Sequence, residues 1–300
     1  MTNIIQKTNE RGIIRSIVRW GLYPISWLII LLSFHLIYTT KLDPRVIWMG
    51  CIGVLFSIYM LAEVTLPYQK KWSMNFSTFI ADIKFIVFNG AFLALLSSGL
   101  ALFTITVSGS NSGFVSDLPK IVQLGMALLI FELINYGLHR FMHEGRGKVG
   151  KFMWLLHAAH HLPPRLYLLM HAVFHPFNAF FIQTFAIILP VWLMGYEPNV
   201  VAMFLIINGM HGLISHFNVD VRMGFLNYIF IGPELHRYHH SASMSEAKNY
   251  GAVLSIYDLI FGTFIYHPNV APNRLGVFGK SALPAYEKFW KVIILPFQKR

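Results

Sequence analysis

The sequence has few charged residues and a single cysteine. Only 12% of its 300 residues are charged, whereas a soluble domain usually carries roughly 25%. Together with long apolar runs, this deficit indicates an integral membrane protein. The one cysteine, Cys51, lies in an apolar run, which excludes a disulfide framework and a thiolate-bound cluster. Any metal must therefore be held by nitrogen and oxygen ligands.

Acidic residues are also scarce. The chain has 13 Asp and Glu against 24 Lys and Arg, which gives a net charge of +11. A basic membrane protein usually carries its excess charge on cytoplasmic loops that face anionic lipid. We therefore do not interpret the charge as a nucleic-acid binding site.

The apolar runs predict an all-α membrane protein with four long spans and a helical hairpin. Each span is long enough to cross a hydrocarbon core of about 30 Å. The hairpin has arms at 177–194 and 198–215, joined by a Gly/Pro/Asn turn, and either spans fully or is re-entrant. The four spans cover about 22–40, 46–66, 84–107 and 120–138.

The distribution of basic residues predicts the orientation. With the N-terminus inside, the outer loops and their edges contain only Lys41, Arg45 and Lys120 of the 24 basic residues. The N-terminus and a helical, histidine-rich cap are then cytosolic. Near the N-terminus, arginines recur every four residues over 11–19. This spacing fits either a short amphipathic helix on the membrane surface or a plain positive flank.

Histidines are concentrated in the second half of the chain, with thirteen of fourteen between residues 139 and 267. They form one H-x-x-x-H motif and two H-x-x-H-H motifs. Helix positions i, i+3 and i+4 share one face, so we expect each motif to aim its imidazoles at a common point. The motif histidines are His139 and His143; His157, His160 and His161; and His236, His239 and His240.

Four more histidines lie between these motifs. His175 and His216 flank the predicted hairpin, so both lie at its cytosolic base, level with the end of the fourth span; they are further candidate ligands, with His171 and His211 after them. So many imidazoles exceed the four ligands of a zinc site, and no H-E-x-x-H motif occurs. The number argues for two ions, although imidazole suits iron, copper, nickel and zinc alike.

Glu132 is the one acidic residue well inside a predicted span. A carboxylate in the membrane is costly and indicates a function. Glu132, Tyr136, His139 and His143 form one helical stripe, so Glu132 could accept a hydrogen bond from a ligand histidine and fix its ring. The alternative is a hydrogen bond that only packs helices together.

These motifs resemble the fatty acid hydroxylase/sterol desaturase superfamily. The resemblance covers about 120–266 and includes the residues around the histidines. The matching flanks are His139-Arg140, His175-Pro176, His216-x-Asn218, Pro233-Glu234-Leu235-His236-Arg237, Asn249-Tyr250-Gly251, Asp258 and Phe261-Gly262-Thr263.

The resemblance implies an O2-dependent enzyme that holds two iron ions and acts on a membrane lipid. It favours the eight motif histidines as ligands, then His175 and His216, with Asn218 and Asp258 as supporting residues. A separate ferredoxin- or cytochrome-type donor would supply electrons, and zinc could occupy the sites adventitiously. The family often has Asp where this chain has Glu132, so the role of this carboxylate can differ.

We therefore expect one structural unit with three parts: an amphipathic helix and three spans in 1–119, the catalytic region in 120–266 and a tail in 267–300. Lipid hydroxylation is the leading activity, and desaturation by the same centre is the alternative. A metal transporter or sensor would place its ligands near the middle of the membrane, whereas these histidines lie at the span ends. A bis-histidine haem protein would not need two H-x-x-H-H motifs.

Overall fold

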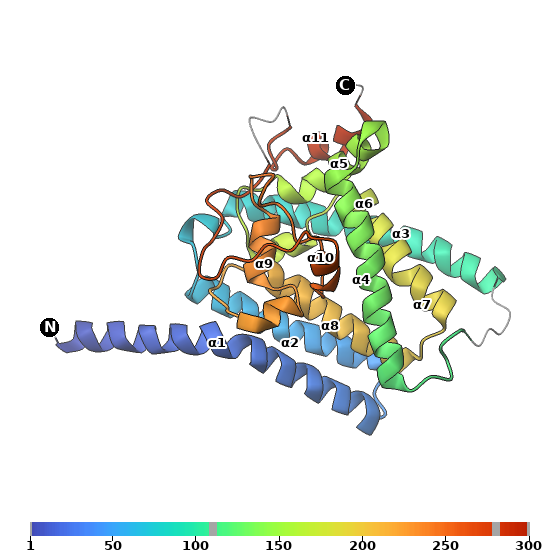
Figure 1. Ribbon diagram of the computed structural model, residues 1–300, viewed down its shortest axis with the longest axis horizontal. Coiled ribbons are helices and arrows are strands. Elements are labelled where there is room, and N and C mark those ends of the chain that lie inside the picture. The colour runs from blue at the N-terminus through green and yellow to red at the C-terminus, as the bar shows by residue number, and fades with distance from the viewer. Residues whose placement is uncertain (1, 108–112, 278–282, 299–300) are drawn as a thin grey trace.

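The computed structural model describes residues 2–107, 113–277 and 283–298, and this part of the chain is helical, with isolated β-bridges and no β-strand. In chain order the helices are α1 (Thr2–Thr39), α2 (Pro44–Thr65), η1 (Lys70–Trp72), α3 (Phe76–Val107), α4 (Lys120–Glu144), α5 (Gly147–His161), η2 (Leu168–Ala172), α6 (Pro176–Phe181), η3 (Ile182–Ile188), α7 (Leu189–Met194), α8 (Pro198–His216), η4 (Gly224–Tyr228), α9 (Pro233–His239), α10 (Ile256–Ile260), α11 (Phe289–Ile293) and η5 (Leu295–Phe297). Figure 1 shows their arrangement.

Six stretches of helix among the described residues are long and apolar enough to cross a membrane, which confirms the predicted all-α, multi-pass membrane protein. Both arms of the hairpin are among them. The six stretches are Gly12–Thr39, Pro44–Thr65, Phe76–Leu95, Lys120–Glu144, Pro176–Met194 and Pro198–His216.

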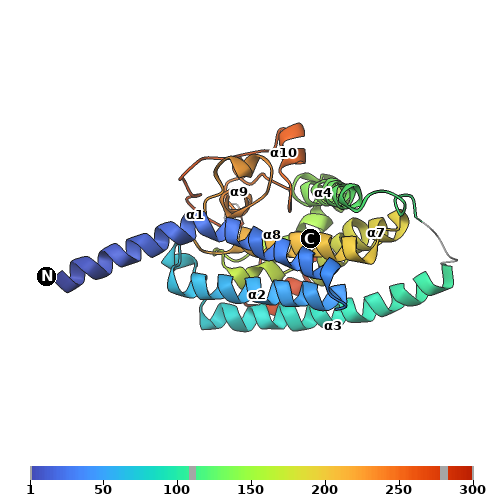
Figure 2. The same ribbon diagram turned by 90° about the horizontal axis from the view of Figure 1, so that it is seen from below.

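Two helix starts differ most from the sequence-based expectation. The basic N-terminal segment and the first span form a single helix, α1, whose N-terminal part extends beyond the other helices (Figures 1 and 2). Helix α3 begins at Phe76, eight residues before the predicted start of the third span. Asn75 and Thr78 explain this start, because each side chain accepts the backbone N–H of the other, at 2.9 Å. This reciprocal cap satisfies N–H groups that a helix end otherwise leaves unpaired.

The first arm of the hairpin contains a wide π-helical turn, η3, between α6 and α7. Pro190 is the second residue of α7, two positions after the end of η3. A proline inside a helix lacks the N–H that would bond to the carbonyl four residues earlier, and its ring crowds that carbonyl. A wider turn before the proline relieves the crowding. Gly195 then ends α7 with φ +68°, a conformation that favours glycine, and Pro198 opens α8.

Helix α8 is the central helix of the bundle. In its apolar 18-residue stretch 61% of the residues are buried, against 17–39% in the corresponding stretches of the other five spans. It packs against α1, α2, α4 and α9. Side chains from α2, α4 and α8 such as Tyr59, Phe131 and Phe204 form the main core. The C-terminal ends of α4 and α8 are thereby held close to α5 and α9, which carry the H-x-x-H-H motifs (Figure 1).

Candidate metal centre

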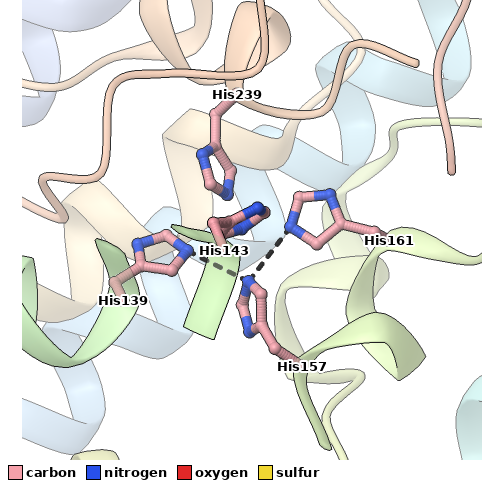
Figure 3. Close-up of side chains that lie close together, drawn as sticks. All are labelled: His139, His143, His157, His161 and His239. Carbon is pink, nitrogen blue, oxygen red and sulfur yellow. Dashed lines mark hydrogen bonds between the residues drawn. The ribbon is translucent and has the colours of Figure 1, made fainter. Parts of the chain in front are cut away.

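Nine histidines form two clusters of imidazoles. In each cluster one ring nitrogen from every member lies within 4.8 Å of those of the others. Figure 3 shows the rings of the first cluster pointing toward one another. The first cluster comprises His139, His143, His157, His161 and His239, and the second comprises His160, His216, His236 and His240.

Each H-x-x-H-H motif is divided between the two clusters, whereas the sequence led us to expect one common point per motif. In α5, His157 and His161 point to the first cluster and His160 points to the second. In the motif at α9 the assignment is reversed, because His239 alone belongs to the first cluster. Neighbouring residues on a helix are turned by about 100° from one another, whereas residues four apart differ by only about 40°. The last two histidines of each motif therefore face different ways.

The imidazoles within each cluster converge on one another through their ring nitrogens. His157 Nε2 lies 3.0 Å from both His139 Nε2 and His161 Nε2. In the second cluster, His216 Nε2 lies 2.9 Å from the Nε2 atoms of His160 and His236. An unprotonated ring nitrogen is a metal ligand, and several of them repel one another unless a cation lies among them. This donor set fits a metal ion in each cluster.

The outward ring nitrogens of five cluster histidines lie against oxygen acceptors. Since an acceptor oxygen requires an N–H, each of these Nδ1 atoms carries the proton and leaves Nε2 free to bind a metal. The pairs are His139 with Tyr250 O (2.8 Å), His157 with Asn178 Oδ1 (2.8 Å), His160 with Val173 O (2.9 Å), His216 with Gly212 O (3.0 Å) and His239 with Lys248 O (3.0 Å).

Two further ring nitrogens support the same interpretation. His143 Nε2 and His239 Nε2 are buried in the first cluster and have no hydrogen-bond partner among the described residues. A buried polar atom without a partner destabilises the fold by about 1–3 kcal/mol. A bound metal ion would remove this cost, so the residues present fit a metal.

Burial also keeps the cluster imidazoles uncharged. Removal from water, reinforced by neighbouring imidazoles, lowers the pKa of His160, His161 and His240 well below the usual value. The same causes lower the pKa of His236 and His239. Neutral imidazole is the form that binds metal, so these histidines need not lose a proton first.

The three other candidate histidines lie outside both clusters. His175 Nε2 donates to Ile293 O at 2.9 Å, and its Nδ1 accepts the N–H of Phe177 at 3.2 Å. His211 Nδ1 donates to Ile231 O at 2.8 Å. The ring of His171 lies 5.3 Å from that of His216, yet its nitrogens belong to neither cluster.

Glu132 on α4 does not contact a cluster histidine. It is fully buried, and its carboxylate accepts the backbone N–H groups of Ala252, Val253 and Leu254 at 2.6–2.8 Å. The carbonyl of Tyr250, which accepts the N–H of His139, belongs to the same loop. The carboxylate is therefore connected to His139 only through this loop, and it makes neither of the two contacts that the sequence suggested, a direct hydrogen bond to a histidine or one between helices.

Asp258 holds the same loop from its other side. Its carboxylate accepts the N–H groups of Tyr250 and Gly251 at 2.8 Å and the hydroxyl of Thr263 at 2.6 Å. Burial raises the pKa of the Asp258 carboxyl to about 6, so it is still ionised at neutral pH. The Tyr136 hydroxyl lies 2.9 Å from that of Thr263, which joins α4 to this network.

Asn218 acts further from the clusters. Its backbone N–H donates to Glu63 at 2.7 Å, and its side-chain amide bonds both polar backbone atoms of Gln69. These contacts fix the chain two residues after His216. The sequence pattern gave no reason to single out Glu63, which bonds Asn218 across 155 residues, or Asn178, which bonds His157 across 21 residues.

A cavity of about 210 Å³ adjoins both clusters. Its wall includes His139 and His157 of the first cluster and His160, His216 and His236 of the second. The rest of the wall is mostly apolar and comes mainly from α4, η3 and α8; His171 of η2, Asn178 of α6 and the loop at Gly251 complete it. A hydrocarbon segment could therefore lie directly against the two groups of ligands.

Comparisons with known proteins agree with this site. Residues 124–263 match the family described as fatty acid hydroxylase. The ornithine lipid hydroxylase OlsE of Rhizobium tropici is 29% identical to this chain, over 88% of this chain and 80% of the relative's length. The alkylglycerol monooxygenases of Danio rerio and Homo sapiens are 29% and 32% identical over 46% and 43% of this chain, but this covers only 30% and 27% of their length.

No solved structure matches the chain. The matched region 124–263 includes all nine cluster histidines, as well as Glu132 and Asp258. These relatives are a hydroxylase and monooxygenases, which are oxidoreductases. The region that carries the clusters is thus similar to the fatty acid hydroxylase family, within the superfamily that the histidine motifs resemble.

Proposed function

We propose that this protein is a membrane-bound, di-iron, O2-dependent lipid hydroxylase. The observation that carries the proposal is the pair of histidine clusters on the wall of one mainly apolar cavity. The overall reaction would be RH + O2 + 2e⁻ + 2H⁺ → ROH + H2O. Two bound irons would supply the activation of O2 for this reaction.

The nine cluster histidines are the proposed ligands. This set contains the eight motif histidines together with His216, and leaves out His175, His171 and His211. The protein contributes the orientation of each imidazole through its outward hydrogen bond, and the apolar wall excludes water from the cavity. Desaturation is not favoured, because the similar proteins are hydroxylases and monooxygenases.

The proposal is tested with the protein expressed in a lipid-producing host. We expect metal analysis of the purified protein to find two irons per chain, and lipid mass spectrometry to find a product 16 Da heavier than its precursor. Growth under ¹⁸O2 should raise this difference to 18 Da. A 2 Da loss would instead indicate desaturation, and an unchanged lipid profile with an iron-loaded protein would contradict the proposal.

The electron donor is a further part of the proposal. Arg146, Lys148 and Lys151 form an exposed basic surface at the start of α5. Trp154, one turn further along, has its ring 5.3 Å from that of His143 and 6.0 Å from that of His161. An acidic ferredoxin- or cytochrome-type protein docked on the basic surface would therefore be close to the first cluster. In this arrangement the N-terminus and the histidine face are cytosolic.

Charge reversal at this surface should slow electron delivery. We expect Lys148→Glu with Lys151→Glu to lower donor-supported turnover about tenfold at low salt, because opposite charges accelerate association of proteins. Iron content should not change. The matched control is Lys41→Glu with Arg45→Glu, which reverses two exposed charges at the predicted outer side. Equal turnover by the two double variants would contradict docking at α5.

A further inference from the structure

The cavity beside the clusters is not purely apolar. Three asparagine side chains line it: Asn178, whose Oδ1 bonds His157, Asn135 from α4 and Asn208 from α8. Asn135 is only 6% exposed, and its Nδ2 has no hydrogen-bond partner among the described residues. Asn208 is partly buried, and its side-chain amide takes part in no hydrogen bond within that part of the chain. Both amides belong to membrane-spanning helices, where an unsatisfied polar group is costly.

We propose that the substrate carries a hydrogen-bond acceptor oxygen close to the carbon that is hydroxylated, and that Asn135 and Asn208 bind this oxygen. The carbonyl of an amide or ester linkage is the chemistry that fits, because each asparagine can donate through its Nδ2. This inference rests on the proposed function and names the class of lipid that the site accepts.

The position of Asn135 limits the distance between acceptor and reacting carbon. Asn135 lies four residues before His139 on the same helix, which is about 6 Å along its axis. An extended chain advances a little over 1 Å per bond, so the acceptor lies within about five bonds of the carbon at the clusters. The middle of a long acyl chain has no acceptor within that distance of its carbon atoms.

The size of the cavity supports recognition of this kind. At about 210 Å³ it is smaller than the roughly 300–1,000 Å³ of pockets that enclose a drug-sized ligand. Only the reacting segment of a lipid can enter, while the rest of the molecule stays outside. Discrimination therefore depends on the atoms near the reacting carbon. A plain hydrocarbon segment would leave Asn135 unpaired, and sites built to bond a polar group reject analogues that lack it.

The first test is to locate the inserted oxygen. Tandem mass spectrometry of the ¹⁸O-labelled lipid made by the wild-type enzyme should place the new hydroxyl within about five bonds of a carbonyl or another acceptor oxygen. A hydroxyl in the middle of an acyl chain, far from any acceptor, would overturn the inference while leaving the proposed function intact. Absence of any labelled lipid from an iron-loaded enzyme would instead count against the proposed function.

The second test uses variants. Asn135→Leu with Asn208→Leu keeps side chains of similar size but removes both donors. We expect conversion of the labelled lipid to fall about tenfold or more, with iron content equal to that of the wild type. Gln183→Leu is the matched control, because Gln183 is an exposed amide on η3 that does not line the cavity. Conversion by the double variant at the rate of the control would also overturn the inference.

Discussion

Alanine at either His157 or His236 is expected to abolish lipid hydroxylation and to reduce the bound iron from two ions per chain to one. These residues are central in their clusters: His157 contacts His139 and His161, and His236 contacts His216 and His240. Loss of a hydrogen-bond partner behind a ligand already lowers metal affinity or activity by about 10–100-fold. Removal of a ligand should therefore lower turnover by more than about 100-fold. Metal analysis and turnover of ¹⁸O2 into lipid measure the two effects.

Two other histidines provide the comparison. His35→Ala is the matched control, because His35 is exposed on α1 and lies outside both clusters. His175→Ala separates the ligand set indicated by the sequence from the one indicated by the structure. It should retain both irons, because His175 bonds Ile293 and Phe177. Loss of an iron in His175→Ala, or retention of both in His157→Ala, would contradict the proposed ligands.

Glu132→Gln is expected to have the second largest effect, although Glu132 contacts no cluster histidine. A glutamine has only one side-chain oxygen for the three backbone N–H groups that the carboxylate accepts. Its NH2 group is itself a donor, so it would face backbone N–H groups with which it cannot form a hydrogen bond. Each buried group left unpaired costs about 1–3 kcal/mol. We therefore expect a lower unfolding temperature in detergent together with partial loss of iron, because the displaced loop carries the carbonyl that orients His139.

The control for Glu132 is a carboxylate at the end of a spanning helix. Glu197→Gln removes a half-exposed partner of Lys120, with the two charged atoms 3.0 Å apart. Exposed ion pairs contribute only about 0–1 kcal/mol, so this variant should keep its iron and its unfolding temperature. If Glu132→Gln matched it in both measurements, the loop would not depend on the carboxylate.

The membrane-spanning helices could be predicted from the sequence because a helix that crosses the hydrocarbon core must be apolar along most of its length. Apolar character is local and additive, so the hairpin between Pro176 and His216 was visible without any tertiary contact. Helix ends were less accurate. The start of α3 depends on the cap formed by Asn75 and Thr78, which hydropathy does not detect.

The roles of the buried polar groups could not be read from spacing. Glu132 shares a helical stripe with His139, so a direct hydrogen bond was the natural expectation. The structure instead brings a loop from 120 residues further along the chain against the carboxylate. Asn178 and Glu63 also act on distant partners. Such contacts depend on how helices and loops pack, and that is a property of the whole fold.

The sequence by itself determined that this is a membrane protein whose histidine motifs hold metal-binding nitrogens on helices. Only the tertiary structure decided which histidines belong together. Along one helix, His160 and His161 are adjacent and face directions about 100° apart, so a motif cannot fill one site alone. Each cluster becomes complete when α4, α5, α8 and α9 pack, and the orientation of these helices about one another assigns His160 to one cluster and His161 to the other.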